Sequence, residues 1–426
     1  MPSRALPILA APLLLALACR GPGAAPAPAP ARVAVPDTSP YAVVRPRPGV
    51  LHRIILIGDA GKAKDGDSVM VALHEVAAQH PSTTVLFLGD NAYPCGITRW
   101  TRTPPAICRM RVPPGTAESP AEYANRQARS RLMAQIHALG GTQAQGYFIP
   151  GNHDWYGDTI AGRAGADAIR REGEIIRQAR DSSYRVAMLP DNTCPGPESI
   201  DLPRVRLIIL DTQRLLRIFE DARRRQPRLR PPPDCRFWTP AQIGPELARL
   251  VRGARDEGRE VVVASHHPPV TYGSHCPRFT RRAINWLRGP GERAVTRDRF
   301  GPQQDVRTPA YDRMRLFMAE TFQESPPLVY AGGHDHSLQV IRTRLVANRT
   351  GCALAAAAAA NVIVSGAGSN LSAVKPWAGL QPDVPSARGF VVLDVSPDEF
   401  RVRIVQPAAI LRGAHPDNAA GYVLTR

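Results

Sequence analysis

Short runs of Ile, Val and Leu recur along the chain from residue 51, and each is followed closely by Gly, Asp, Asn, Ser or His. The runs do not alternate with polar residues, which is the pattern of strands buried on both faces. The expected strands are residues 54–57, 85–88, 147–149, 207–210, 261–264, 328–330 and 362–364. Two later runs, 390–395 and 400–405, predict strands that close the domain.

Longer stretches with a helical pattern separate several of these runs. The expected helices are residues 68–79, 122–139, 167–180, 240–255 and 311–322. Strands that alternate with helices predict an α/β protein in which helices cover a largely parallel sheet. In such sheets ligands bind beyond the carboxyl ends of the strands. Three segments, 99–120, 214–238 and 278–307, are expected to be loops.

The first residues resemble a bacterial lipoprotein leader. Arg4 precedes an apolar run over 5–18, and Ala16-Leu17-Ala18-Cys19 resembles a lipobox, in which the cysteine receives lipid after cleavage. An ordinary signal peptide cleaved near Ala18 is the alternative. No later apolar run approaches the ~20 residues of a membrane span. We therefore expect a signal peptide (1–18), a Pro/Ala-rich tether (19–47), a main domain (48–412) and a C-terminal tail (413–426). The protein would be exported, periplasmic or at the cell surface, and anchored to the membrane through Cys19.

Six cysteines remain after Cys19, and an even number in an exported chain predicts up to three disulfides. They are Cys95, Cys108, Cys194, Cys235, Cys276 and Cys352. The sequence does not choose among the possible pairings, although Cys95 with Cys108 and Cys194 with Cys235 would each close an apparent insertion. The spacings resemble no zinc-finger pattern, so disulfides are favoured over thiolate ligands.

A formal net charge of +17 suggests a polyanionic partner, but only three of the 54 basic residues are lysine. Because almost all basic residues are arginine and the chain is rich in Ala and Pro, the charge indicates compositional bias. Aromatic residues make up only 6% and are not interleaved with the arginines, so nucleic-acid binding is not expected. A basic surface would still attract small anionic substrates.

Five short polar motifs follow predicted strands. They are Gly58-Asp59-Ala60-Gly61, Gly89-Asp90-Asn91-Ala92-Tyr93, Gly151-Asn152-His153-Asp154, Val263-Ala264-Ser265-His266 and Gly333-His334-Asp335-His336. Each is weak alone, because an Asp after a strand is as often a helix cap. Together they collect carboxylate, amide, phenol and imidazole groups at one sheet edge. These oxygen and nitrogen donors suit Fe, Mn or Zn, and two such ions ~3.5–4 Å apart can activate water for phosphoryl transfer.

In this order the motifs resemble those of the calcineurin-like metallophosphoesterases and, within them, the purple acid phosphatases: GDxG, GDxxY, GNH(D/E), VxxH and GHxH. The resemblance spans roughly residues 53–405 and is closest to the small tartrate-resistant type, which 333–339 and 365–368 also resemble. It implies a four-layer α/β sandwich with two mixed β-sheets flanked by helices. A dinuclear metal site would lie at the carboxyl ends of the strands, and residues 48–412 would form the catalytic domain.

The first motif separates the branches of this family. Most members have a histidine where this chain has Gly61, whereas the purple branch supplies Tyr93 instead. A phenolate favours a ferric ion, so the resemblance implies Fe(III) and a divalent ion of Fe, Zn or Mn. Its implied ligands are Asp59, Asp90, Tyr93 and His336 for Fe(III), with Asp90 bridging to the divalent ion held by Asn152, His266 and His334.

Two further histidines receive roles from the resemblance. His153 faces the substrate phosphate in this family and is expected to bind it or to protonate the leaving alkoxide. His275 matches a second-sphere histidine of the small branch. Asp154 and Asp335 are expected to orient the adjacent histidines, and His267 receives no role.

The expected function is hydrolysis of a phosphate monoester by a metal-bound hydroxide, at acidic pH if a ferric ion keeps its water deprotonated. A phosphodiesterase or nucleotidase on the same scaffold is the alternative. A surface lipoprotein that keeps the scaffold for binding alone is an alternative of another class. The oligomeric state stays open.

Overall fold

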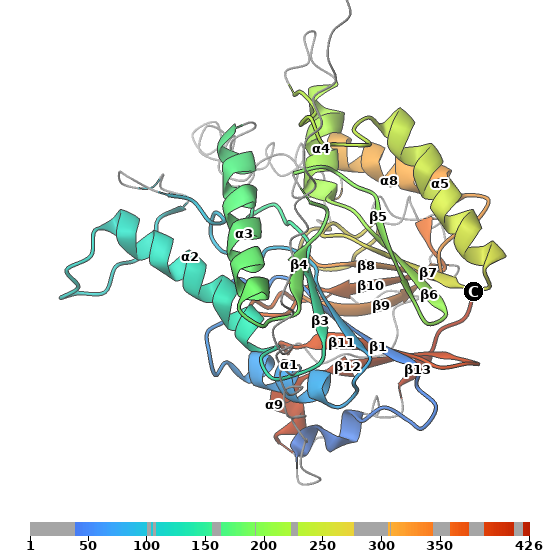
Figure 1. Cartoon of the computed structure of the whole chain (residues 1–426), viewed down its shortest axis with the longest axis horizontal. Coiled ribbons are helices and arrows are strands. Elements are labelled where there is room, and N and C mark those ends of the chain that lie inside the picture. Colours follow the sequence, from blue (N-terminus) through green and yellow to red (C-terminus); the bar gives the residue numbers. More distant parts are fainter. Residues whose placement is uncertain are drawn as a thin grey trace, which may run out of the picture. The chain divides into compact units, whose positions relative to one another are not determined.

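The computed structural model of the chain describes residues 39–99, 104, 108–155, 163–191, 193–222, 229–276, 306, 308–343, 358–374, 387–412 and 421–426. The expected signal peptide, Cys19 and most of the expected tether lie outside these residues. The described residues form two mixed β-sheets with helices beside each (Figure 1).

The first sheet has seven strands in the order β13-β12-β11-β1-β2-β3-β4. Their bounds are β1 (His52–Ile57), β2 (Thr83–Phe87), β3 (Gln145–Phe148), β4 (Val186–Met188), β11 (Phe390–Val395), β12 (Phe400–Val405) and β13 (Tyr422–Val423). Strands β1 to β4 are parallel to one another, and β11 pairs antiparallel with β1. The sheet is therefore parallel on one side of β1 and antiparallel on the other.

The second sheet has six strands in the order β5-β6-β7-β8-β10-β9. Their bounds are β5 (Glu198–Leu202), β6 (Val205–Ile209), β7 (Glu260–Ala264), β8 (Val329–Gly332), β9 (Leu338–Arg342) and β10 (Asn361–Ser365). Strands β6, β7, β8 and β10 are parallel, and β5 and β9 pair antiparallel at the two edges. The expectation of one largely parallel sheet from the hydrophobic pattern is therefore wrong, while the two mixed sheets implied by the family resemblance are confirmed.

Strand β1 shows how the layers are built. Ile54 and Leu56 lie in an apolar core that also contains Val262 of β7, so this face of the first sheet packs on the second. Ile55 and Ile57, on the opposite face, lie in the core under the helices of the first sheet. Both faces of the strand are buried, which explains why its sequence does not alternate. The result is a sandwich of four layers.

The helices divide between the two sheets (Figure 1). Helices α1 (Ser68–Ala78), α2 (Pro120–His137) and α3 (Arg163–Asp181) contribute apolar side chains to the core of the first sheet. Helices α4 (Thr212–Asp221), α5 (Pro240–Asp256) and α8 (Pro309–Phe322) do the same for the second sheet, and the short α9 (Pro407–Ile410) follows β12. The five expected helices are all present, with ends shifted by a few residues.

Helix α4 corrects the expected loop at 214–238. The carboxylate of Asp211 caps the helix by accepting a hydrogen bond from the backbone N–H of Arg214 at 2.8 Å. Leu215 and Leu216 are fully buried against the second sheet. The arginine-rich composition of this segment obscured a short amphipathic helix, which tertiary packing stabilises.

Both ends of the expected main domain also change. A 3₁₀ helix, η1 (Pro40–Val44), lies within the expected tether, and its Tyr41 and Val44 are buried. The guanidinium of Arg53 donates to the Val44 carbonyl at 2.8 Å. The packed structure therefore includes residues before 48. Strand β13 lies within the expected tail and pairs with β12, so Tyr422 and Val423 belong to the sheet.

Two disulfides join the pairs that the sequence suggested. Cys95 is bonded to Cys108 across 13 residues, and Cys194 to Cys235 across 41 residues. Cys276 is also disulfide-bonded, and Cys352 lies outside the described residues. The five cysteines that the structure describes are therefore structural and not metal ligands.

Candidate metal centre

The five motifs follow β1, β2, β3, β7 and β8. Three of the expected ligands, Asp59, Asp90 and His334, have positive φ angles of 57°, 56° and 65°. Residues other than glycine rarely adopt this conformation, and those that do concentrate at functional sites where the surrounding structure enforces it. Sharp turns at three separate strand ends therefore direct these side chains to one place.

One half of the centre consists of Asp59, Tyr93 and His336. The Tyr93 hydroxyl donates to Oδ1 of Asp59 at 2.9 Å and lies 3.0 Å from Nε2 of His336. Nε2 of His336 is also 3.3 Å from Oδ1 of Asp59. The backbone N–H of His334 donates to the other oxygen of Asp59 at 2.7 Å, which ties the first motif to the fifth.

The other half consists of Asn152, His266 and His334. Oδ1 of Asn152 lies 2.9 Å from Nε2 of His266 and 3.2 Å from Nδ1 of His334. Nδ1 of His266 donates to the carbonyl of Leu88 at 2.8 Å, because a carbonyl can only accept. The imidazole is thereby oriented with Nε2 toward the centre.

Asp90 lies between the two halves. Its Oδ1 is 3.4 Å from Nε2 of His266, and a carboxylate oxygen lies within 4.8 Å of the ligand atoms of both Asp59 and His266. The backbone N–H of His153 donates to Oδ1 at 2.9 Å. This buried carboxylate therefore lies between the two halves, where the family resemblance expects a ligand shared by two metal ions.

The electrostatics fit a cation at this place. Burial, with the charges of Asp59 and Asp90, raises the pKa of Tyr93 well above its ordinary value. Burial opposes the ionisation of Asp90, but His266 and His153 lower the pKa of Asp90 to about 2. Burial likewise opposes the protonation of His266, yet Asp90 and Asp59 raise the pKa of His266. The buried carboxylates therefore favour positive charge beside them, which a metal ion would supply.

The donor atoms are close enough to serve metal ions. Ligand atoms of Asp59, Asp90 and His266 lie within 4.8 Å of one another, and the same holds for His266, His267 and His334. All five side chains are buried, and their nitrogen and oxygen donors suit Fe, Zn or Mn. The residues present therefore fit the two metal ions that the sequence implies.

Buried carboxylates accept hydrogen bonds from the backbone of the motif loops. Asp154 accepts hydrogen bonds from the backbone N–H groups of Gly151, Asn91 and Ala92 at 2.8–3.1 Å, which joins the second motif to the third. The amide of Asn91 in turn donates to Glu172 of α3 at 3.0 Å. Asp154 thus orients loop backbones more directly than it orients a histidine ring.

Asp335 supports the segment before His275. Its carboxylate accepts hydrogen bonds from the Thr271 hydroxyl at 2.6 Å and from the Ser274 backbone N–H at 3.0 Å. The ring of His275 stacks on that of His334, with centroids 4.1 Å apart and an interplanar angle of 26°. Its ring also meets that of His336 edge-on at 6.4 Å. The ring of His275 therefore contacts the rings of two expected ligands, His334 and His336.

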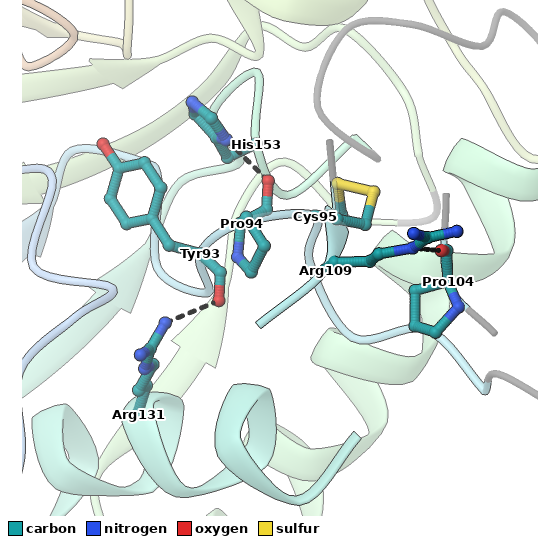
Figure 2. Close-up of a disulfide and its surroundings, with 8 residues drawn as sticks. Tyr93, Pro94, Cys95, Pro104, Arg109, Arg131 and His153 are labelled. Carbon is teal, nitrogen blue, oxygen red and sulfur yellow. Dashed lines mark hydrogen bonds between the residues drawn. A yellow bond between two sulfur atoms is a disulfide. The ribbon is translucent and has the colours of Figure 1, made fainter. Parts of the chain in front are cut away.

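His153 lies on the open side of the centre, with 24% of its side chain exposed. Its Nδ1 is 2.6 Å from the carbonyl oxygen of Pro94 (Figure 2), so Nδ1 carries the hydrogen. Its Nε2 lies 3.9 Å from Oδ2 of Asp90. Nε2 is therefore the ring atom available to a group bound at the centre.

The start of α4 contributes contacts that the sequence reading missed. The backbone N–H of His267 donates to the Thr212 hydroxyl at 3.0 Å, and Nδ1 of the His267 ring lies 2.9 Å from that hydroxyl. Asp211 accepts a hydrogen bond from the Trp155 indole N–H at 2.8 Å, directly after the third motif. Asp211 and Thr212 come directly after the strand expected at 207–210. They are therefore polar residues at the end of an apolar run, the same signal that marks the five motifs.

Gly61 explains why a histidine ligand is absent from the first motif. A Cβ atom at Gly61 would lie 2.5 Å from the Asp90 carbonyl oxygen and 2.7 Å from the Ala92 backbone nitrogen. The N–H of Tyr93 donates to the Gly61 carbonyl at 3.1 Å. The two loops are in backbone contact here, and Tyr93 reaches the centre from the second loop.

Gly61→Ala is therefore expected to lower the free energy of unfolding by about 1–3 kcal/mol and to reduce the bound metal, because residues 90–92 must move. Thermal unfolding and metal analysis of the purified protein measure both effects. Gly253→Ala is the matched control, since a Cβ there meets only Nη1 of Arg206, at 3.4 Å. Full metal content in Gly61→Ala would contradict the expectation.

No model of a protein family matches the chain, and comparison with curated proteins finds no match. Among solved structures, the chain is similar to "GAP50 the anchor in the inner membrane complex of Plasmodium", with 12% identity, a TM-score of 0.47 and 88% of each chain covered. It is also similar to a dimetal phosphatase from Danio rerio, with 12% identity, a TM-score of 0.39, and 84% of this chain and 97% of the other covered. Neither similarity carries a residue assignment.

Proposed function

We propose that the chain is an exported dinuclear-metal phosphatase of the calcineurin-like, purple acid phosphatase type, acting on phosphate monoesters. The observation that supports this most is the convergence of donor groups from five strand ends on one buried centre. The motifs are separated by up to about 275 residues, as the bond between His334 and Asp59 illustrates. Burying so many acidic, phenolic and imidazole groups together costs desolvation free energy, which bound metal ions would offset.

Two metal ions, Fe(III) with a divalent Fe, Zn or Mn, would supply Lewis acidity and activate the attacking water when bound. Asp59, Tyr93 and His336 would hold the ferric ion, and Asn152, His266 and His334 the divalent ion, with Asp90 shared. His153 would act at the leaving group: its Nδ1–H is donated to Pro94, so a second proton on Nε2 would be available to the departing alkoxide. His275 would keep the His334 ring in place by stacking on it.

One experiment tests this function against its alternatives. The purified protein is analysed for metal and assayed with p-nitrophenyl phosphate, its bis ester, ATP and phytate. We expect two metal ions per chain and the fastest turnover with the monoester, at acidic pH. Faster turnover of the bis ester or of ATP would indicate a phosphodiesterase or a nucleotidase. Fewer than two ions with no turnover would indicate a protein that uses the scaffold for binding.

Tyr93→Phe tests the ferric assignment. Removing the hydroxyl that contacts Asp59 and His336 is expected to abolish a visible absorption band arising from tyrosinate bound to iron. Absorption spectra of the purified variant and parent protein, at equal iron content, make the comparison. An unchanged visible band in the variant would overturn the assignment of Fe(III) to this half of the centre.

Export is supported by the disulfides Cys95–Cys108 and Cys194–Cys235, since such bonds persist in oxidising compartments. In the parts of the chain that the structure describes, every helix is too short or too polar to cross a membrane. Attachment through lipid on Cys19 is a proposal from the leader sequence alone. The proposed partners are a phosphate ester and, through Cys19, a membrane surface, without nucleic acid.

A further inference from the structure

The loop from Tyr93 to Gly96 joins the Cys95–Cys108 disulfide to the candidate centre (Figure 2). Its first residue, Tyr93, reaches the half of the centre formed with Asp59 and His336. Its second residue, Pro94, presents a carbonyl oxygen to Nδ1 of His153 at 2.6 Å. One short loop therefore contacts both an expected metal ligand and the residue expected to act on the leaving group.

The bond to Pro94 decides how His153 can act. It fixes the hydrogen on Nδ1 and leaves Nε2 facing Asp90. The ring of His153 also packs against that of Tyr93, with centroids 4.4 Å apart. Movement of the Pro94 carbonyl would free the ring to rotate, and Nε2 would no longer be held toward the centre.

Two groups hold this loop: Cys108, before α2, and Arg131, within α2. Cys95 is bonded to Cys108, and both half-cystines are buried. Nη1 of Arg131, in α2, donates to the Tyr93 carbonyl at 3.0 Å (Figure 2). Gly96 ends the loop with a φ of 65°, and any side chain there would collide with the Asp154 carbonyl, next to His153. The disulfide therefore lies one residue from the carbonyl that orients His153, in tightly packed surroundings.

We propose that the Cys95–Cys108 disulfide and Arg131 are positioning elements that hold the Pro94 carbonyl against Nδ1 of His153, so that the imidazole can protonate the leaving group. The proposal rests on the proposed phosphatase function and adds to it a covalent support for the acid. It requires the disulfide to affect the reaction through His153, beyond any contribution to folding stability.

The test is the double variant Cys95→Ser/Cys108→Ser, alone and combined with His153→Ala. We expect kcat for an alkyl phosphate to fall about 10-fold, less than the ~100-fold that a misplacement of about 1 Å can cost. The fall with p-nitrophenyl phosphate should be much smaller, because that leaving group needs little protonation. In the His153→Ala background, removing the disulfide should cause no further fall. Metal content should match that of the parent protein.

Cys194→Ser/Cys235→Ser is the matched control, because it removes the other disulfide with the longer loop. This variant is expected to have a lower melting temperature. Any change in kcat that it causes should be the same in the parent protein and in the His153→Ala background. Arg131→Met is a second probe if the Cys95→Ser/Cys108→Ser protein does not fold. It removes the donor to the Tyr93 carbonyl and should show the same dependence on the leaving group and on His153.

The outcomes separate the two proposals. Equal losses with both substrates, additive losses with His153→Ala, or turnover equal to that of the parent protein would each overturn the positioning role and leave the phosphatase function intact. Absence of turnover in the unmodified, metal-loaded protein would overturn the phosphatase function together with the positioning role.

Discussion

Asp90→Asn is expected to lower kcat for a phosphate monoester on the order of 10³-fold, the scale that follows from losing several kcal/mol of metal-ion catalysis. Asp90 lies between both halves of the centre, with a carboxylate oxygen within 4.8 Å of the ligand atoms of Asp59 and His266 and Oδ1 3.4 Å from Nε2 of His266. Asparagine keeps the size of the side chain but loses the charge and one of the two oxygens that bridging requires. We expect the variant to bind fewer than two metal ions per chain.

Turnover and metal content, measured on the same purified sample, check this expectation. Asp201→Asn is the control, because Asp201 on β5 is a partly exposed carboxylate that forms an ion pair with Arg206 at 2.6 Å. This control should keep full activity and both metal ions. Two tightly bound ions together with normal turnover in Asp90→Asn would remove the bridging role from the proposed centre.

His153→Ala is expected to lower kcat for an alkyl phosphate by about 10²–10⁴-fold, the usual contribution of a general acid. The loss with p-nitrophenyl phosphate should be much smaller, since nitrophenolate leaves without a proton. Metal content should not change, because the side chain of His153 is not among the expected ligands. The kcat ratio of the two substrates, measured for variant and parent protein, is the decisive quantity.

His137→Ala is the control, because His137 is a surface histidine with no expected role in the reaction. Its side chain is 43% exposed and pairs with Asp65 at the surface, so both substrates should be hydrolysed at the parent rate. If His153→Ala slowed both substrates equally, His153 would be assigned to phosphate binding and not to protonation of the leaving group.

The sequence pointed to most of the residues that gather at the centre, and the family resemblance implied which of them are ligands; His267, which lies among them, received no role. Each expected ligand follows a run of apolar residues, and a run long enough to form a buried strand needs no distant information to be recognised. Because parallel strands bring their carboxyl ends to one edge, polar residues after Ile57, Phe87 and Phe148 must meet. For the cysteines the sequence left the pairing open and indicated only that Cys95 with Cys108 and Cys194 with Cys235 would each close an apparent insertion, as the structure has them.

Tertiary structure decided how these residues work together, because the relevant contacts join segments far apart in the chain. The hydrophobic pattern treats Ile54 and Ile55 alike, although one packs between the sheets and the other under helices. Only the packed second sheet stabilises α4 within an arginine-rich segment. The tautomer of His153 likewise depends on the carbonyl of Pro94, which is 59 residues away in the chain. Local composition thus determined which groups are present, whereas long-range packing determined their orientation, their protonation and their supports.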